Sequence, residues 1–241
     1  MPSRTVGSFS LVKNNDYRQR VGLLTLLVLL TLTFTVTTST HAGIPANNYH
    51  YAYADGGHTR DAGNPADTRQ DSVGYSANAR LNWSASSVGT SMDNDAVWSM
   101  YAHANWEVMV AYNGSANSNL TKQMVKGYNL SQLKIAVFYG CDTANGAFVG
   151  ADHITAAAVT AGAGASIGFY DKVFLNGGFT TGPAHTWSKY FWESMAGGNT
   201  INTAAVFARD RFFQERGAYE GVDKYSTWGN GGQKITPAGF K

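Results

Sequence analysis

Cysteine is almost absent from this sequence, whose 241 residues include a single one, Cys141. One cysteine cannot form a disulfide bond within the chain, so the fold must be stabilised by packing and hydrogen bonding. The sequence also contains no glycine-rich phosphate-binding loop, no zinc-ligand spacing and no Ser-His-Asp pattern. No motif of these kinds therefore competes with the cysteine as the candidate centre of a functional site.

An excess of charge of either sign is also missing once the N-terminal segment is set aside. Residues 1–42 hold four of the 18 basic and one of the 16 acidic residues, which leaves 14 basic and 15 acidic residues in the remainder. A nearly neutral chain lacks the electrostatic footprint of a nucleic-acid-binding protein. The roughly 199 remaining residues are enough for one α/β domain with its own core. We therefore expect residues 43–241 to form a single domain that does not bind nucleic acid.

A long uncharged run near the N-terminus predicts an export signal. Residues 21–36 carry no charge, follow a basic leader and precede small residues that end at Ala42. This order is typical of a secretory signal peptide, so we expect residues 1–42 to be removed and the protein to be secreted, without stable membrane association. The alternative is a retained membrane anchor through residues 21–36, although a comfortable span needs about 20 residues.

The most informative stretch is an apolar run that ends at the lone cysteine. Residues 135–140 carry little polarity and predict a strand buried on both faces of a sheet, with Cys141 directly after it. A second apolar run, residues 96–102, ends at His103. If the two strands are parallel neighbours, both side chains lie at the carboxyl edge of the sheet, where open α/β sheets bind ligands. An imidazole there can take the thiol proton and produce the nucleophilic thiolate.

Other interpretations of these residues remain open. A free cysteine is more often a small buried apolar residue than a nucleophile. His153, which begins a predicted helix, and His185, in a predicted loop, could approach the thiol if the strand order differed. His58 with Asp55 and Asp61 has residue types that bind metals, but such loop residues are more often solvated turn formers. We therefore predict no metal site.

The first half of the domain predicts short elements of both kinds. Tyrosines alternating with smaller residues over 47–54 predict a strand at one edge of the sheet, and the polar, glycine-rich residues 56–65 predict a loop. We expect a helix over 76–88. A strand over 106–112 then ends at Asn113-Gly114, a dipeptide that favours a hairpin turn.

The second half predicts a strand-helix-strand unit. We expect a helix over 152–161, with Asp152 at its amino end, and a strand over 165–170, which together require a parallel sheet. Residues 171–185 predict a loop that walls a site at the edge bearing Cys141. Two helices follow, the second capped by Asn199 or Thr200; their predicted buried residues are Trp187, Tyr190, Phe191, Met195, Ile201, Ala205, Ala208 and Phe212. The predicted fold is a three-layer α/β/α sandwich with a mostly parallel central sheet.

The order and spacing of these motifs resemble the caspase-like cysteine peptidase superfamily, which includes caspases, gingipains, clostripain and CHAT domains. Residues 139–144, Tyr-Gly-Cys-Asp-Thr-Ala, are similar to the Ala-Cys-Glu-Thr-Gly type of nucleophile motif. Residues 101–104, Tyr-Ala-His-Ala, correspond to a pattern that usually reads Gly-His-Gly. The resemblance covers residues 95–240. It implies a caspase-like domain with a small hairpin beside the active site, and residues 233–237 resemble the closing strand and Pro-containing end of family members.

The resemblance implies an exported cysteine endopeptidase. In this mechanism Cys141 attacks a peptide carbonyl, and His103 serves as general base and acid while an acyl-enzyme forms and is hydrolysed. The backbone N–H groups of Cys141 and Ala104 would bind the oxyanion. Family members that cleave after Arg or Lys place an acidic residue in the substrate pocket; the candidates are Asp142 and, second, Asp171. Asp142 is equally suited to cap a helix.

Ala104 is the clearest departure from the family pattern. Alanine tolerates fewer backbone conformations than the usual glycine, so a left-handed residue here would leave the oxyanion hole strained or absent. The alternative function is therefore a catalytically inactive caspase-like module used for extracellular binding or at a surface. For the enzyme we expect a peptide or protein substrate, a monomer and no cofactor. Some relatives require calcium, but no clear cluster of calcium ligands is present in the sequence.

Overall fold

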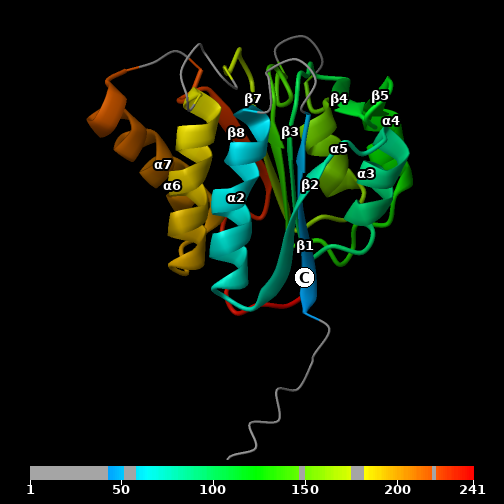
Figure 1. Cartoon of the computed structure of the whole chain (residues 1–241). Helices are drawn as coiled ribbons and strands as arrows, with labels where there is room; N and C mark the ends of the chain where they lie inside the picture. The colour runs from blue at the N-terminus through cyan, green and yellow to red at the C-terminus, as the bar shows by residue number, and fades with distance from the viewer. Residues whose placement is uncertain (1–42, 52–57, 147–149, 175–181, 219–220) are drawn as a thin grey trace, which may run out of the picture. The chain divides into compact units, whose positions relative to one another are not determined.

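A mostly parallel sheet runs through the centre of the protein in the computed structural model, which describes residues 43–51, 58–146, 150–174, 182–218 and 221–241 (Figure 1). For residues 58–64 it describes the backbone alone. Among these residues the sheet has six strands in the order β2-β1-β3-β6-β7-β8. Neighbouring strands are parallel except β8, which is antiparallel to β7. The strands are β1 (Ile44–His50), β2 (Tyr75–Leu81), β3 (Val97–Tyr101), β6 (Ile135–Tyr139), β7 (Ala165–Phe169) and β8 (Tyr225–Gly229).

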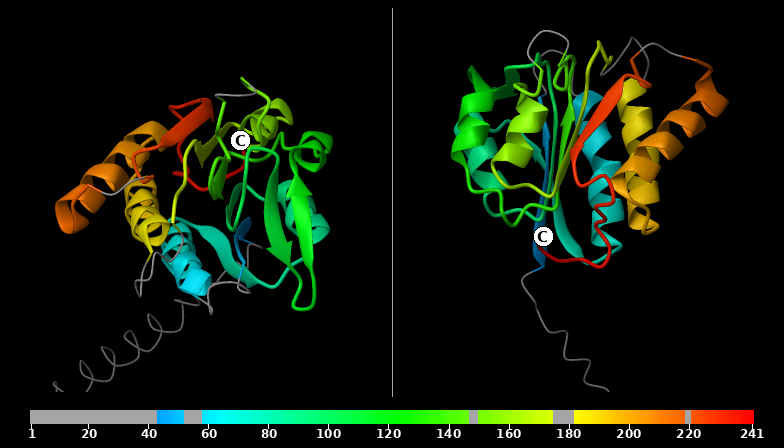
Figure 2. Two further views of the ribbon diagram at one scale, coloured as in Figure 1. Left: turned by 90° about the horizontal axis from the view of Figure 1, so that it is seen from above. Right: turned by 180° about the vertical axis from the view of Figure 1, so that it is seen from behind.

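Helices cover both faces of the sheet (Figures 1 and 2). One face carries α2 (His58–Asp71), α6 (Pro183–Ala196) and α7 (Ile201–Arg216). The other carries α3 (Ala85–Met92), α4 (Lys122–Gly127) and α5 (Ile154–Thr160). A separate apolar cluster fills the space between the sheet and each helical layer. The predicted α/β class with a mostly parallel central sheet between helical layers is therefore confirmed.

The two apolar runs form strands because each strand has a core on both of its faces. All five residues of β3 and all five of β6 are buried. In β6, Val137 packs into the cluster beneath α6 and α7, whereas Phe138 packs into the cluster beneath α3 to α5. Successive side chains of a strand point to opposite faces. When both faces are covered, every side chain is buried, and the strand is a continuous apolar run without alternating polar residues.

Two predictions for the N-terminal half are wrong. Strand β1 is not at a sheet edge, because β2 pairs with one of its sides and β3 with the other. Residues 76–88 do not form one helix: β2 ends at Leu81, and α3 begins after Ser84, whose hydroxyl accepts a hydrogen bond from the Ser87 N–H. Alternation of apolar and polar residues from Tyr75 to Leu81 has the period of a strand and was the better guide.

The polar stretch predicted as a loop is helical from His58 onward, in α2. Contacts of α2 with the rest of the fold explain this outcome. Ala66 is fully buried in the core, and the Gln70 and Asn48 side-chain amides exchange hydrogen bonds at 2.8 and 3.3 Å. The helix is thus stabilised by tertiary contacts, which override the weak helix propensity of Gly, Asn and Pro.

The predicted hairpin is present between β3 and β6. Strands β4 (Val108–Tyr112) and β5 (Asn117–Thr121) pair antiparallel. At the turn the Asn113 side-chain oxygen accepts hydrogen bonds from the N–H groups of Ser115 and Ala116. Met109 and Leu120 are fully buried and attach the hairpin to the α3–α5 side of the core.

The C-terminal half follows the prediction more closely. Strand β7 is parallel to β6, and Thr200 caps α7 through the Thr203 N–H. Asp152, however, is not the cap of α5; His153 is, and Asp152 forms ion pairs with Lys122 and Lys126. Residues 233–237 do not form the closing strand, which is β8, farther upstream.

The predicted leader, residues 1–42, lies outside the described residues, as do Asp55 and the side chains of His58 and Asp61, the metal group that was considered. Within the part that the structure describes, no helix is long and apolar enough to cross a membrane.

Candidate functional site at the carboxyl edge of the sheet

His103 and Cys141 follow neighbouring parallel strands at the same position. Strands β3 and β6 pair in register, with Tyr101 opposite Tyr139, and each functional residue lies two positions farther on. The Ala102 N–H continues the ladder by donating to the Tyr139 carbonyl at 3.1 Å. The prediction that the two strands are parallel neighbours is thus confirmed, and both residues follow the carboxyl ends of their strands. This edge of the sheet is at the top of Figure 1.

The loops that carry His103 and Cys141 are in direct contact. A Cβ atom on Gly140 would lie 2.5 Å from the Cβ of Ala104 and 2.8 Å from the carbonyl oxygen of Ala102. Real Cβ atoms do not approach other atoms so closely, so only glycine fits here. The glycine before the cysteine therefore sets the spacing between the two loops.

Ala104 does not have the left-handed backbone that was considered because alanine replaces glycine at this position. Among the described residues other than glycine, a positive φ occurs at Asn82 and Asp142. Ala104 instead forms an antiparallel bridge with Met109. On one side of the bridge the Val110 N–H donates to the His103 carbonyl, and on the other side the Asn105 N–H donates to the Val108 carbonyl. This is the non-hydrogen-bonded type of pair, so the N–H of Ala104 points away from β4.

The Cys141 thiol is half-buried and already has a hydrogen-bond partner. Its Sγ donates to the carbonyl oxygen of Val173 at 3.4 Å. Burial raises the pKa of the thiol, and the negative charge of the adjacent Asp142 raises it further. The sulfur is therefore protonated at neutral pH, and it becomes a good nucleophile only if a base removes the proton.

The His103 side chain is exposed and touches an aromatic ring. The rings of Tyr51 and His103 meet edge to face, with centroids 5.7 Å apart and planes at 76°. No hydrogen bond joins the imidazole to the Cys141 thiol in the part of the chain that the structure describes. The two groups share an edge and a loop contact, and proton transfer requires one side chain to rotate towards the other.

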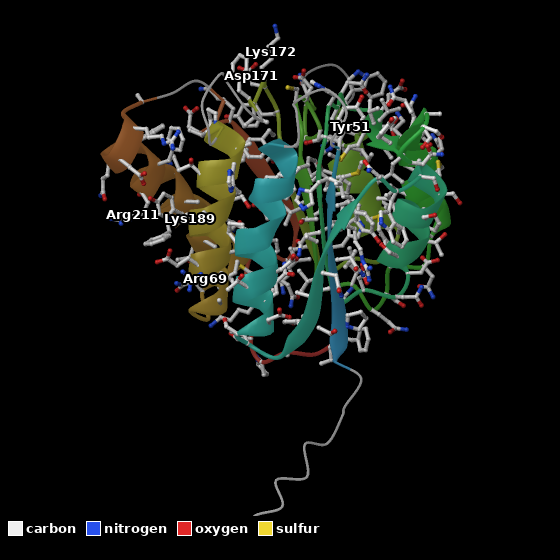
Figure 3. All side chains as sticks on the ribbon, viewed as in Figure 1. Tyr51, Arg69, Asp171, Lys172, Lys189 and Arg211 are labelled. Carbon is white, nitrogen blue, oxygen red and sulfur yellow. The ribbon has the colours of Figure 1, made fainter. Side chains whose placement is uncertain are left out.

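Asp142 and Asp171, the candidate substrate-binding residues, are brought together next to the thiol. The Asp142 N–H donates to the Asp171 carbonyl at 3.2 Å. The Asp142 carboxylate accepts a hydrogen bond from the Asn145 amide at 2.9 Å, and the Asp171 carboxylate accepts one from the Lys172 N–H at 2.7 Å. Neither carboxylate has an ion pair with another described residue. Figure 3 shows Asp171 and Lys172 at the same end of the molecule as Tyr51.

Asp142 does not cap a helix, which was the alternative interpretation. It has a left-handed backbone, with φ 58°, in the turn that follows Cys141. Aspartate and asparagine tolerate this conformation better than most residues.

The side chains of the alternative histidines are both buried. His153 is fully buried, and its Nδ1 accepts the Ala156 N–H at 3.2 Å as the cap of α5. Burial also lowers the pKa of His153, which favours the neutral ring that this bond requires. His185, predicted in a loop, is buried within α6, which packs on one face of the sheet.

Two contributors to the site were missed by sequence reasoning. Val173, in the loop after β7, accepts the hydrogen bond of the thiol through its backbone carbonyl. Any residue type has such a carbonyl, so the sequence gives no signal for this contact. Tyr51 contacts His103, and here a signal existed, because Tyr51 follows β1 as His103 follows β3. Part of the loop predicted to wall the site, residues 175–181, lies outside the described residues.

Comparisons with known proteins add no identification. No family model matches the chain, and a search of curated proteins finds no similar sequence. Between residues 43 and 241, apart from the stretches not described, no group of three or more His, Cys, Asp or Glu side chains could hold a metal ion. The fold and site define an α/β domain with a thiol and an imidazole at one edge of a parallel sheet.

Proposed function

We propose that the chain is an exported, caspase-like cysteine endopeptidase in which Cys141 is the nucleophile and His103 the general base and acid. The observation that carries the proposal is that His103 and Cys141 each lie two residues beyond the last paired residues of β3 and β6. The hairpin between the two strands and the contact of Gly140 with Ala104 support it, because both fix the His loop against the Cys loop.

The proposed chemistry uses groups at this edge alone. His103 takes the thiol proton as the sulfur attacks the carbonyl carbon of a peptide bond, and the resulting oxyanion is bound by the N–H groups of Cys141 and Ala104. When the C–N bond breaks, His103 passes the proton to the leaving amine, and a thioester remains on Cys141. Water then attacks the thioester as His103 accepts a proton from it; the C–S bond breaks, the carboxylic acid product leaves, and His103 returns the proton to the sulfur. The outward direction of the Ala104 N–H is compatible with this role.

The thiol must leave Val173 before it reacts. Rotation about the Cα–Cβ bond of Cys141 breaks the hydrogen bond to the Val173 carbonyl and frees the sulfur for attack. Since burial raises the thiol pKa, little thiolate exists beforehand. Proton removal by His103 is therefore part of the attack, and loss of His103 should remove most of the reactivity.

Two neighbouring carboxylates favour a basic side chain in the substrate. Asp142 and Asp171 are linked through their backbones and lack ion pairs with other described residues. An arginine or lysine side chain of a peptide would pair with these carboxylates. We expect cleavage after Arg or Lys.

One observation favours the second candidate, an inactive extracellular binding module of the same fold. The thiol donates to Val173, and no bond joins it to His103 among the described side chains. If this arrangement is the only one that the protein adopts, the edge of the sheet presents a surface without a working nucleophile.

Labelling with a thiol-reactive peptide distinguishes the two candidates. The purified protein is treated with a peptide acyloxymethyl ketone that ends in Arg, and the modified residue is identified by mass spectrometry. The peptidase predicts stoichiometric modification of Cys141 that disappears in His103→Ala, whereas iodoacetamide still reaches the thiol of this variant. Slow labelling that is the same with and without His103 would support the binding module. Asp210→Asn, an exposed position on α7, provides the control and should label like the wild type.

A further inference from the structure

Tyr51, His103 and Cys141 lie in a row along the carboxyl edge of the sheet. Each residue follows one of three adjacent strands, β1, β3 and β6. The Tyr51 N–H extends the first ladder by donating to the Tyr101 carbonyl at 3.0 Å. His103 therefore lies between the other two, with Tyr51 on the β1 side and Cys141 on the β6 side.

Tyr51 itself is firmly held. Its side chain is buried, its hydroxyl donates to the Asn117 amide oxygen of β5 at 3.2 Å, and its ring meets that of Tyr112 of β4 edge to face. The same hairpin binds the backbone of His103, because the Val110 N–H donates to the His103 carbonyl at 2.9 Å. One hairpin thus fixes both the backbone of the histidine and the ring that contacts its side chain.

We infer that Tyr51 is a positioning residue that restrains the His103 imidazole on the side away from Cys141, a role that rests on the proposed function. An exposed imidazole samples several rotamers, and each rotamer that points away from the sulfur lowers the fraction competent for proton transfer. The edge-to-face contact at 5.7 Å, made with a buried and hydrogen-bonded ring, excludes the rotamers that swing towards β1. Tyr51 acts through His103 and does not touch the reacting atoms.

The test compares three variants of the full chain in wild-type and His103→Ala backgrounds. Tyr51→Leu removes the ring but keeps apolar volume, Tyr51→Phe keeps the ring without the hydroxyl, and Tyr128→Leu is a control away from this edge. The rate of Cys141 alkylation by iodoacetamide is measured across pH. The His103 Cε1–H resonance is followed by NMR, and thermal unfolding reports the fold of each variant.

We expect Tyr51→Leu to lower the His103-dependent rate by about threefold to tenfold, the factor that corresponds to a typical aromatic pair energy. Tyr51→Phe should stay within about twofold of the wild type, because the ring contact persists. In the His103→Ala background Tyr51→Leu should have no effect. The His103 Cε1–H resonance should move in Tyr51→Leu and stay in place in Tyr128→Leu, because the contacting ring shifts it.

Equal losses of rate with and without His103, or an unmoved His103 resonance in a folded Tyr51→Leu, would overturn the positioning role. If His103→Ala alone leaves the wild-type rate unchanged, the proposed peptidase fails instead. The NMR shift then still decides whether Tyr51 restrains the imidazole, so the two failures are distinguishable.

Discussion

Gly140 lies against Ala104 with no room for a side chain between them, and this contact joins the loop of the candidate nucleophile to the loop of the candidate base. The usual glycine of the family pattern is missing at position 104, yet the pair still contains one glycine, on the opposite loop. The close approach therefore depends on Gly140, and Ala104 keeps an unstrained backbone.

Adding a methyl group at this contact should separate the two loops. Gly140→Ala places a Cβ 2.5 Å from that of Ala104, and we expect it to destabilise the fold by about 1–3 kcal/mol and to slow Cys141 alkylation. Urea denaturation measures the first effect. Gly127→Ala, where nothing lies within 4 Å, is the control and should be nearly neutral. Combining Gly140→Ala with Ala104→Gly should recover part of the loss; no recovery would show that the Ala104 contact is not its cause.

The reactivity of the thiol should titrate at unusually high pH when no substrate is bound. Burial and the Asp142 charge raise the Cys141 pKa above the usual value of about 8.5, so the alkylation rate should rise with pH through a midpoint above that value. Asp142→Asn removes the neighbouring charge and tolerates the same backbone, so its midpoint should fall. Asp210→Asn, on α7, should leave the midpoint unchanged. A wild-type midpoint below 8 would contradict the described environment of the sulfur.

Recognition of basic substrates should depend on the two carboxylates. Asp171→Asn and Asp142→Asn should each lower the second-order rate of labelling by an Arg peptide by about tenfold or more, the typical effect of losing a hydrogen bond to a charged group. Labelling by the corresponding Ala peptide, which presents no cation, should change little in Asp171→Asn and should change in Asp142→Asn only as the thiol pKa does. The ratio of the two rates is the measurement. An unchanged ratio in both variants would refute these residues as the specificity determinants while leaving the dyad untouched.

A buried carboxyl outside the site should make stability depend on pH. Burial raises the pKa of Asp95 to about 7, and its Oδ1 accepts a hydrogen bond from the Asn47 amide at 2.7 Å. Because the folded state holds this proton more tightly than the unfolded chain, the contribution of Asp95 to stability is complete below about pH 4 and is lost as the pH rises to about 7. We expect a decline of about 1–3 kcal/mol between pH 4.5 and 7.5 in urea denaturation.

Asp95→Asn cannot titrate and should flatten this dependence, whereas Asp210→Asn should keep it. Burial also raises the pKa of Asp67 to about 6, so a smaller slope should remain in Asp95→Asn. The same slope in Asp95→Asn and in the wild type would exclude Asp95 as its source.

The strands at the centre of the sheet could be predicted because burial on both faces leaves a continuous apolar run. Residues 135–140 and 96–102 carry this pattern, and their pairing brings His103 and Cys141 to one edge. The outer parts were harder. Strand β2 has small alanines in two of its apolar positions. Helix α2 is polar at most of its residues and depends on contacts such as that of Asn48 with Gln70.

The site was predictable only where it follows from strand order. His103 and Cys141 are placed by the register of β3 and β6, which an apolar pattern reveals. The Val173 carbonyl and the ring of Tyr51 reach the site through tertiary packing. No sequence pattern predicts which residue a backbone carbonyl or a single tyrosine will contact. The capping of α5 by His153 in place of Asp152 has a similar origin, because Lys122 and Lys126 bind the aspartate.

Capture of an acyl-enzyme tests the central proposal most directly. The protein is mixed with an activated ester of acetyl-arginine, quenched in acid, and the mass of the peptide that contains Cys141 is followed over time. We predict an acetyl-arginyl adduct on Cys141 that forms and then disappears by hydrolysis in the wild type, and that does not accumulate in His103→Ala. The absence of an adduct in a wild-type protein whose thiol still reacts with iodoacetamide, or equal acylation in both proteins, would contradict the peptidase.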